Sequence, residues 1–180
     1  MTEKSVLNIA LTGFMAVGKS AVARNLARRL NRRFVDLDKL IEKSEGMKVG
    51  DIFSQKGESY FRRVEKQKLR EVLFEHDQVI ATGGGVVMDQ DNLQLLREKS
   101  FLVCLNAAPE VLLRRARNNR QRPLLAGGNR AQQIQKLLTQ RQAAYAQAHV
   151  AVDTSDSTVE QVADKIIALW NARPLMGCKP

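Results

Sequence analysis

The stretch Gly13-Phe14-Met15-Ala16-Val17-Gly18-Lys19-Ser20 fits the pattern G-x-x-x-x-G-K-[S/T]. An apolar run at Val6–Leu11 precedes it and is typical of a buried strand, and the apolar spacing after it predicts a helix over Lys19–Asn31. A glycine-rich loop between a strand and a helix turns its backbone N–H groups toward an anion. The stretch therefore predicts a binding site for a nucleoside triphosphate.

The residue types in this loop indicate what each could do. The Lys19 ammonium would neutralise the outer phosphates, and the Ser20 hydroxyl can ligate Mg²⁺. We expect the nucleotide to be contacted by six consecutive residues: Ala16, Val17, Gly18, Lys19, Ser20 and Ala21. A glycine turn followed by a solvated lysine is the alternative, and the flanking strand and helix disfavour it.

Short apolar segments alternate with amphipathic ones along the 180 residues. We predict strands at Val6–Leu11, Arg33–Asp36, Val79–Thr82, Phe101–Asn106 and His149–Asp153. We predict helices at Lys19–Asn31, Asp38–Glu45, Val49–Phe53, Glu58–Phe74, Asp89–Glu98, Pro109–Asn118, Arg130–Ala148 and Thr158–Ala172. Asp89 is expected to cap one of these helices, and Ser157-Thr158-Val159-Glu160 has the pattern of a capping box for the last.

This alternation indicates an α/β fold. We expect one domain over residues 1–180, with three α/β/α layers around a five-stranded parallel sheet. Ligands of such sheets bind beyond the carboxyl ends of the strands. The residues that follow each strand are therefore the first candidates for a functional site.

Basic residues are concentrated in one part of the chain, whose net charge is +10. Between Val111 and Val152 there is no aspartate or glutamate, and the basic residues there include Arg114, Arg115, Arg117, Arg120, Arg122, Arg130, Lys136 and Arg141. Such a stretch repels itself unless anions bind to it, which leaves a triphosphate with an acidic co-substrate, or a nucleic acid. The stretch has no aromatic residue before Tyr145 on which bases could stack, so we expect no nucleic-acid partner.

The rest of the composition concerns the cellular setting. No apolar run reaches transmembrane length and the first residues lack a secretion signal, so we expect a cytoplasmic protein without a membrane partner. Cys104 and Cys178 lack metal-ligand spacing and are expected to be reduced thiols. Nothing in the sequence demands more than a monomer, and we expect residues 173–180 to form a disordered tail.

Two carboxylates, Asp36 and Asp38, follow the second predicted strand. In an extended segment they would point the same way, so both could reach one crevice. Phosphoryl transfer needs an oxygen ligand near Mg²⁺ and an acceptor for the proton of the substrate hydroxyl, and two carboxylates can divide these tasks. Because the third and fourth strands end at Thr82 and Asn106, Asp36 is the acid placed to hold the metal. Alternatively, Asp38 only caps the next helix.

Three further features each admit a functional and a structural interpretation. The run Gly83-Gly84-Gly85 indicates backbone that approaches a ligand closely, or a tight turn. Arg62 and Glu65 lie one helical turn apart, either as a surface ion pair or as an arginine held so that it can grip a carboxylate. The segment 122–128 is either a lid that delivers Arg122 to the transferred phosphoryl group or an exposed loop.

Taken in order, these motifs resemble those of shikimate kinase, a P-loop kinase similar to the nucleoside monophosphate kinase group. The match spans roughly residues 6 to 170 and rests on the segments Gly13–Ser20, Asp36–Asp38, Phe61–Glu65, Gly83–Gly85, Arg122–Leu125 and Arg141–Tyr145. The resemblance implies that ATP donates its γ-phosphoryl group to the 3-hydroxyl of shikimate, in aromatic amino-acid biosynthesis. It also implies a substrate-binding helical segment at about 36–65 and a mobile lid at about 114–130.

On the acceptor side, the resemblance implies a role for each matched residue. Arg62 and Arg141 would clamp the carboxylate of shikimate, with Glu65 orienting Arg62. Asp38 would bind the ring hydroxyls and accept the proton. The segment Gly83–Gly85 would border the substrate, and its middle residue would offer a backbone N–H.

On the nucleotide side, the resemblance implies two cations, two metal ligands and two walls for adenine. Lys19 and Arg122 would stabilise charge on the phosphates, while Ser20 and Asp36 would hold Mg²⁺ directly or through water. Adenine would lie between Arg115 and the turn Ser155-Asp156-Ser157. Ser157 is the residue of that turn that is expected to contact it.

Two related kinases are the alternatives. A gluconate kinase also phosphorylates a carboxylated polyol, but it is not expected to combine Asp36–Asp38 with the segment Arg122–Leu125. A nucleoside monophosphate kinase would lack the paired arginines Arg62 and Arg141. The combination of motifs in this chain therefore favours shikimate as the acceptor.

Overall fold

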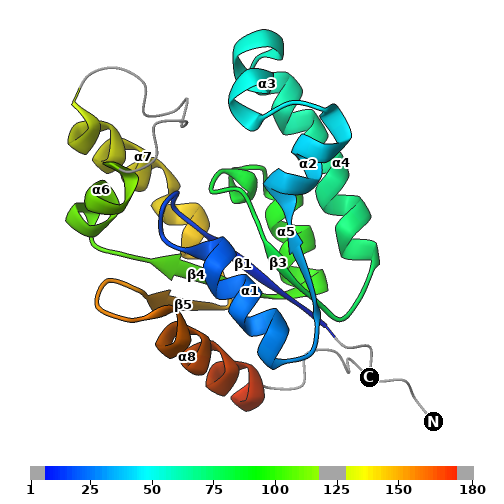
Figure 1. Cartoon of the computed structure of the whole chain (residues 1–180), viewed down its shortest axis with the longest axis vertical. Helices are drawn as coiled ribbons and strands as arrows, with labels where there is room; N and C mark the ends of the chain where they lie inside the picture. Colours follow the sequence, from blue (N-terminus) through cyan, green and yellow to red (C-terminus); the bar gives the residue numbers. More distant parts are fainter. Residues whose placement is uncertain (1–6, 118–128, 174–180) are drawn as a thin grey trace.

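A computed structural model describes residues 7–117 and 129–173 of the chain (Figure 1). Five parallel strands form one sheet in the order β2-β3-β1-β4-β5. The strands are β1 (Asn8–Gly13), β2 (Arg33–Asp36), β3 (Gln78–Ala81), β4 (Ser100–Asn106) and β5 (Val150–Asp153). The five-stranded parallel sheet expected from the sequence is confirmed.

Helices cover the sheet on both faces. The helices are α1 (Lys19–Arg29), α2 (Leu37–Glu45), α3 (Val49–Lys56), α4 (Glu58–Phe74), α5 (Gln90–Lys99), α6 (Pro109–Arg117), α7 (Arg130–Tyr145) and α8 (Val159–Ala172). α1 packs on α8 and on β3, while α5 packs on β4 and on α4 (Figure 1). The three-layer α/β/α fold is therefore confirmed.

The central strand β1 explains where the site lies. All six of its residues are buried, because neighbouring strands flank it and helices cover both faces. Its last residue, Gly13, pairs with Leu105 of β4, so the loop that follows emerges at the carboxyl edge of the sheet. In the sheet, β3 and β2 lie on one side of β1, and β4 and β5 lie on the other. Sheets of this kind bind ligands at their carboxyl edge, in the crevice between these two halves.

Helix caps differ from the predicted ones at two places. Asp36 caps α2, accepting a hydrogen bond from the Lys39 backbone N–H at 3.2 Å, so Asp38 is not the cap. Because α2 begins at Leu37, the argument that both carboxylates lie on an extended segment is wrong. Thr158, rather than Ser157, caps α8, and it forms the capping box with Gln161.

Several expectations lie outside the described residues. They concern Arg122, most of the proposed lid (residues 118–128), Val6 at the start of the first predicted strand, and residues 174–180 of the tail. Within 7–117 and 129–173, no helix is long and apolar enough to cross a membrane. Asp89 caps α5 as expected, accepting a hydrogen bond from the Asn92 N–H.

Candidate active site

The loop between β1 and α1 presents an open helix N-terminus. Gly18 stands at the N-cap with φ 101°, where no side chain caps the helix, and the first turn of α1 contains no acidic residue. The Lys19 ammonium curls back over the loop and donates to the carbonyls of Gly13 at 2.8 Å and Phe14 at 3.0 Å. The first backbone N–H groups of α1 and the lysine charge together suit a phosphate group.

The two predicted magnesium ligands lie together. The Ser20 hydroxyl on α1 donates a hydrogen bond to Asp36 Oδ2 at the end of β2, over 2.7 Å. Hydroxyl and carboxylate oxygens are ligands that Mg²⁺ accepts, usually one or two from the protein with phosphate oxygens and waters completing the shell. No group of three or more His, Cys, Asp or Glu side chains suited to a metal occurs in the described residues. These residues therefore fit a metal carried mainly by a nucleotide.

A pocket of about 360 Å³ lies against this loop. Its lining residues are Met15, Ala16, Gly18, Lys19, Ser20, Ala21, Asp36, Asp38, Thr82, Gly84 and Arg115. It thus brings together five of the six predicted loop residues, both carboxylates and the middle residue of the glycine run. Val17 is not on this wall: its side chain is 1% exposed within the core, and its N–H donates to the Phe14 carbonyl at 3.4 Å.

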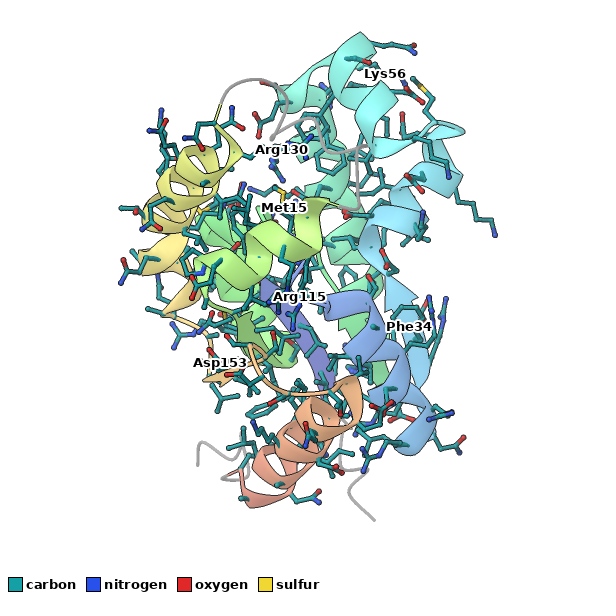
Figure 2. All side chains as sticks on the ribbon, turned by 60° about the vertical axis from the view of Figure 1, so that its left-hand side comes forward. Met15, Phe34, Lys56, Arg115, Arg130 and Asp153 are labelled. Carbon is teal, nitrogen blue, oxygen red and sulfur yellow. The ribbon has the colours of Figure 1, made fainter. Side chains whose placement is uncertain are left out.

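The two residues predicted to contact adenine lie in different places. Arg115 lines the pocket and lies between the α6 ribbon and α1 (Figure 2). Its guanidinium is held by Thr154, with 2.9 Å to the carbonyl and 3.1 Å to the hydroxyl oxygen. Ser157 does not line this pocket, and its hydroxyl instead accepts a hydrogen bond from Lys165 at 3.0 Å. The part played by Thr154 left no recognisable signal in the sequence.

A second pocket, of about 500 Å³, adjoins the glycine run. It is lined by Glu58, Arg62, Glu65, Gly85, Val86, Met88, Asp89, Asn92, Leu137, Gln140 and Arg141. Arg62 comes from α4 and Arg141 from α7, about 80 positions apart in the sequence, and the fold brings both into this one pocket. Gly84 borders the first pocket and Gly85 the second, so a single peptide unit separates them.

Glu65 holds Arg62 from a buried position. Its Oε2 accepts a hydrogen bond from Arg62 Nη1 at 2.7 Å, and the side chain is 1% exposed, so the surface ion pair considered from the sequence is wrong. Burial raises the pKa of the Glu65 carboxyl, and the Arg62 charge opposes that rise. The other oxygen, Oε1, is buried and has no hydrogen-bond partner among the described residues. Glu65 therefore holds the Arg62 guanidinium from inside the protein, and the two residues do not form an exposed ion pair along the helix.

Glu58 is a site residue that the sequence reading missed. It accepts from Arg62 Nη2 at 3.1 Å and from Nε at 3.3 Å, and its side chain is 56% exposed. Its spacing of four residues from Arg62, typical of ion pairs along a helix, is the signal that could have found it. Arg62 is therefore held by two acids, one buried and one exposed.

Arg141 is a buried cation. Its residue is 6% exposed, its guanidinium lies 5.7 Å from the centre of the Phe14 ring, and it forms no ion pair with any acid in the described parts of the chain. Its charge acts on the Glu65 carboxyl and on the Tyr145 phenol, but the Glu65 carboxylate is already hydrogen-bonded to Arg62. A buried cation without an ion pair is costly, because the protein interior solvates it poorly. An anionic ligand in the pocket would supply the missing charge.

The glycine run fits tightly among these groups. A Cβ on Gly83 would lie 2.7 Å from Glu65 Oε1, and one on Gly85 would lie 2.6 Å from Arg62 Nη2. A Cβ on Gly84 would lie 3.0 Å from the Gly13 carbonyl oxygen. The run turns into a short 3-10 helix at Val86–Met88, as the turn interpretation expects, and side chains added to it would meet neighbouring protein atoms at 3.0 Å or less. The approach of its backbone to a ligand stays a prediction.

A phosphate-binding loop joined to a second pocket with two arginines defines a P-loop kinase for a small anionic acceptor. The model of the shikimate kinase family matches residues 15–171. This chain belongs to the shikimate kinase family.

Relatives and solved structures agree with that assignment. The shikimate kinase of Thermoanaerobacter pseudethanolicus is 43% identical over 163 residues, covering 91% of this chain and 95% of the relative. That of Thermus thermophilus is 42% identical over 171 residues, covering 94% and 93%. The structure of shikimate kinase from Acinetobacter baumannii in complex with shikimate superposes with a TM-score of 0.90 at 34% identity, covering 94% of this chain and 95% of that one.

Proposed function

We propose that the two pockets divide the transfer of the ATP γ-phosphoryl group to the 3-hydroxyl of shikimate. The loop pocket holds the triphosphate, and the arginine pocket holds the shikimate carboxylate. One observation carries this division: Arg62 and Arg141, which is buried and forms no ion pair in the described residues, line a pocket that a single peptide unit separates from the phosphate-binding loop. Phosphoryl transfer needs such a juxtaposition of an anionic acceptor and a triphosphate.

The shikimate carboxylate binds between Arg62 and Arg141. Arg141 gains an ion pair, which it does not form with any acid in the described residues. Of the two acids on Arg62, the exposed Glu58 is the one displaced, because an exposed ion pair contributes at most about 1 kcal/mol. The buried Glu65 stays in place and keeps the guanidinium fork aimed at the substrate.

Asp38 accepts the proton of the 3-hydroxyl. It lines the nucleotide pocket, and its Oδ1 would lie 3.2 Å from a Cβ built on Gly83, beside the wall between the two pockets. A carboxylate in that position can bind the ring hydroxyls and take the proton as the oxygen attacks phosphorus. The N–H of Gly84, which borders the nucleotide pocket, donates to the same substrate.

On the nucleotide side, Lys19 stabilises charge on the phosphates, and Ser20 and Asp36 would hold Mg²⁺. A bound metal ion would supply further positive charge to the phosphates. Arg115 contacts the adenine from its position on the pocket wall. Arg122, which lies outside the described residues, is proposed to approach the transferred group, on the strength of its place in a segment without acids.

Two anionic substrates account for the basic stretch of the sequence, and we assign no nucleic acid or membrane to it. Arg115 and Arg141 of that stretch line the two pockets. We propose a monomer, since residues of one chain line both pockets. We also propose that it acts in the cytoplasm.

The acceptor can be tested by ADP release with shikimate, gluconate and AMP offered separately, each with Mg-ATP. Shikimate should support turnover at least 10²-fold above the other two, because only its ring presents a carboxylate and the 3-hydroxyl to the two pockets at once. Omission of Mg²⁺ should abolish the shikimate-dependent rate. Equal rates with gluconate would contradict the proposed acceptor pocket.

The substitution Gly85→Ala should weaken acceptor binding without harming the fold. Gly85 has φ −103° and ψ −4°, values that alanine adopts freely, and the atoms that its Cβ meets are the tip of the Arg62 side chain. The guanidinium must therefore move out of line with the carboxylate. We expect the KM for shikimate to rise roughly 10-fold or more, while the KM for ATP stays within about twofold. An unchanged KM for shikimate would mean that Arg62 does not take part in acceptor binding.

A further inference from the structure

The carbonyl groups of the glycine run are all engaged, but by different kinds of donor. The Gly83 carbonyl accepts from Val86 N–H at 3.3 Å, and the Gly85 carbonyl accepts from Met88 N–H at 3.0 Å, both within the local turn. The Gly84 carbonyl accepts a hydrogen bond of 2.7 Å from the phenol of Tyr145, which is 61 positions away at the end of α7. The middle of the run is therefore held by a remote side chain.

This hydrogen bond fixes the peptide unit between the two pockets. The Gly84 carbonyl and the Gly85 N–H belong to one planar peptide, so holding the carbonyl also sets the direction of that N–H. None of the three glycine N–H groups donates a hydrogen bond within the described part of the chain. Gly84 and Gly85 line the two pockets, so their N–H groups are available to oxygen atoms of a ligand.

Tyr145 is itself well fixed. Its residue is buried, and it follows Arg141 by one turn of α7, so one helix carries both the cation of the acceptor pocket and the phenol that holds the glycine run. Burial raises the pKa of Tyr145 to about 12, and the Arg141 charge opposes the rise, so the phenol keeps its proton near neutral pH. A protonated phenol is a constant donor to the carbonyl.

We propose that Tyr145 is a positioning residue for the transfer reaction: its hydrogen bond orients the Gly84–Gly85 peptide so that the peptide and Arg141 meet shikimate together. Tyr145 touches neither substrate and acts through the glycine run. The inference rests on the proposed function in so far as Arg141 and the glycine run bind the acceptor. It assigns a role to the tyrosine of the Arg141–Tyr145 motif that the proposed chemistry left without one.

The test is Tyr145→Phe, with Tyr60→Phe as the matched control. Both remove one phenol oxygen, and the chain has two tyrosines in all. The Tyr60 hydroxyl donates to Glu45 at 2.8 Å and lines neither of the two pockets. We expect Tyr145→Phe to lower kcat/KM for shikimate about 10-fold through a higher KM, while the KM for ATP stays within twofold. Tyr60→Phe should leave all three values unchanged.

A merely structural role for Tyr145 predicts a lower melting temperature with both KM values preserved, and that result would overturn the proposal. If Tyr145→Phe does not fold, 3-fluorotyrosine incorporated into the Tyr60→Phe protein provides a single ¹⁹F reporter at position 145. Its signal should shift when shikimate binds, and the absence of any shift would equally refute positioning. If instead the parent enzyme shows no turnover with shikimate, the proposed function fails. This outcome differs from preserved KM values and from an unshifted ¹⁹F signal, which refute only the positioning role of Tyr145.

Discussion

Replacing Lys19 with alanine should lower kcat with shikimate by roughly 10²–10³-fold. The ammonium is held over the loop by the carbonyls of Gly13 and Phe14, at the uncapped N-terminus of α1. Negative charge on the phosphates changes as the γ-phosphoryl group leaves ADP, and a fixed cation stabilises that change without reorganising. The fold should survive, since the backbone hydrogen bond from Val22 to Gly18 remains at the start of the helix.

The measurement is steady-state ADP release, with circular dichroism to verify the fold. Lys68→Ala is the control, because Lys68 pairs with Glu71 on the outer surface of α4 and lines neither pocket. The control should keep at least half of the parent rate. If Lys19→Ala were as active as the parent enzyme, the loop would not be the phosphate site.

Arg141→Met should weaken shikimate binding while leaving the protein as stable as before, or more stable. Methionine keeps the unbranched apolar stem and carries no charge, so the substitution removes a buried cation that forms no ion pair in the described residues. Losing a hydrogen-bonded charge pair with the substrate costs about 2–5 kcal/mol, which corresponds to a Kd for shikimate at least 30-fold higher. Gained stability with lost binding is the behaviour expected of a functional residue.

Calorimetric titration with shikimate and thermal unfolding would measure the two effects on the same samples. Arg130→Met at the exposed start of α7 is the control and should change neither. A lower melting temperature together with an unchanged Kd would mean that Arg141 serves the fold and not the acceptor.

The sequence predicted the bounds of those helices and strands whose ends are determined by their own residues. β2 (Arg33–Asp36) and α4 (Glu58–Phe74) begin and end where the patterns predicted. β1 runs over Asn8–Gly13 rather than Val6–Leu11, because its end is set by pairing with β4 as far as Leu105. A strand's own residues do not reveal how far its neighbour extends. Val86–Met88 was not predicted, since three residues are too few for a periodic signal.

The site divides in the same way. The phosphate-binding loop could be predicted because its spacing alone defines the geometry. The burial of Glu65 could not, since the same spacing from Arg62 occurs on exposed helices. The partnership of Tyr145 with Gly84 depends on how α7 packs against the glycine run, and no local pattern encodes a contact between residues so distant in sequence.

The glycine run has a consequence for inhibitors. A side chain at Gly83 would meet Glu65 and Asp38, one at Gly84 would meet the Gly13 backbone and Arg141, and one at Gly85 would meet Arg62. Three adjacent codons are thus constrained for three separate reasons, so a mutation at any of them harms a different part of the reaction. We therefore expect few resistance mutations in this run against a competitive inhibitor that hydrogen-bonds to its backbone.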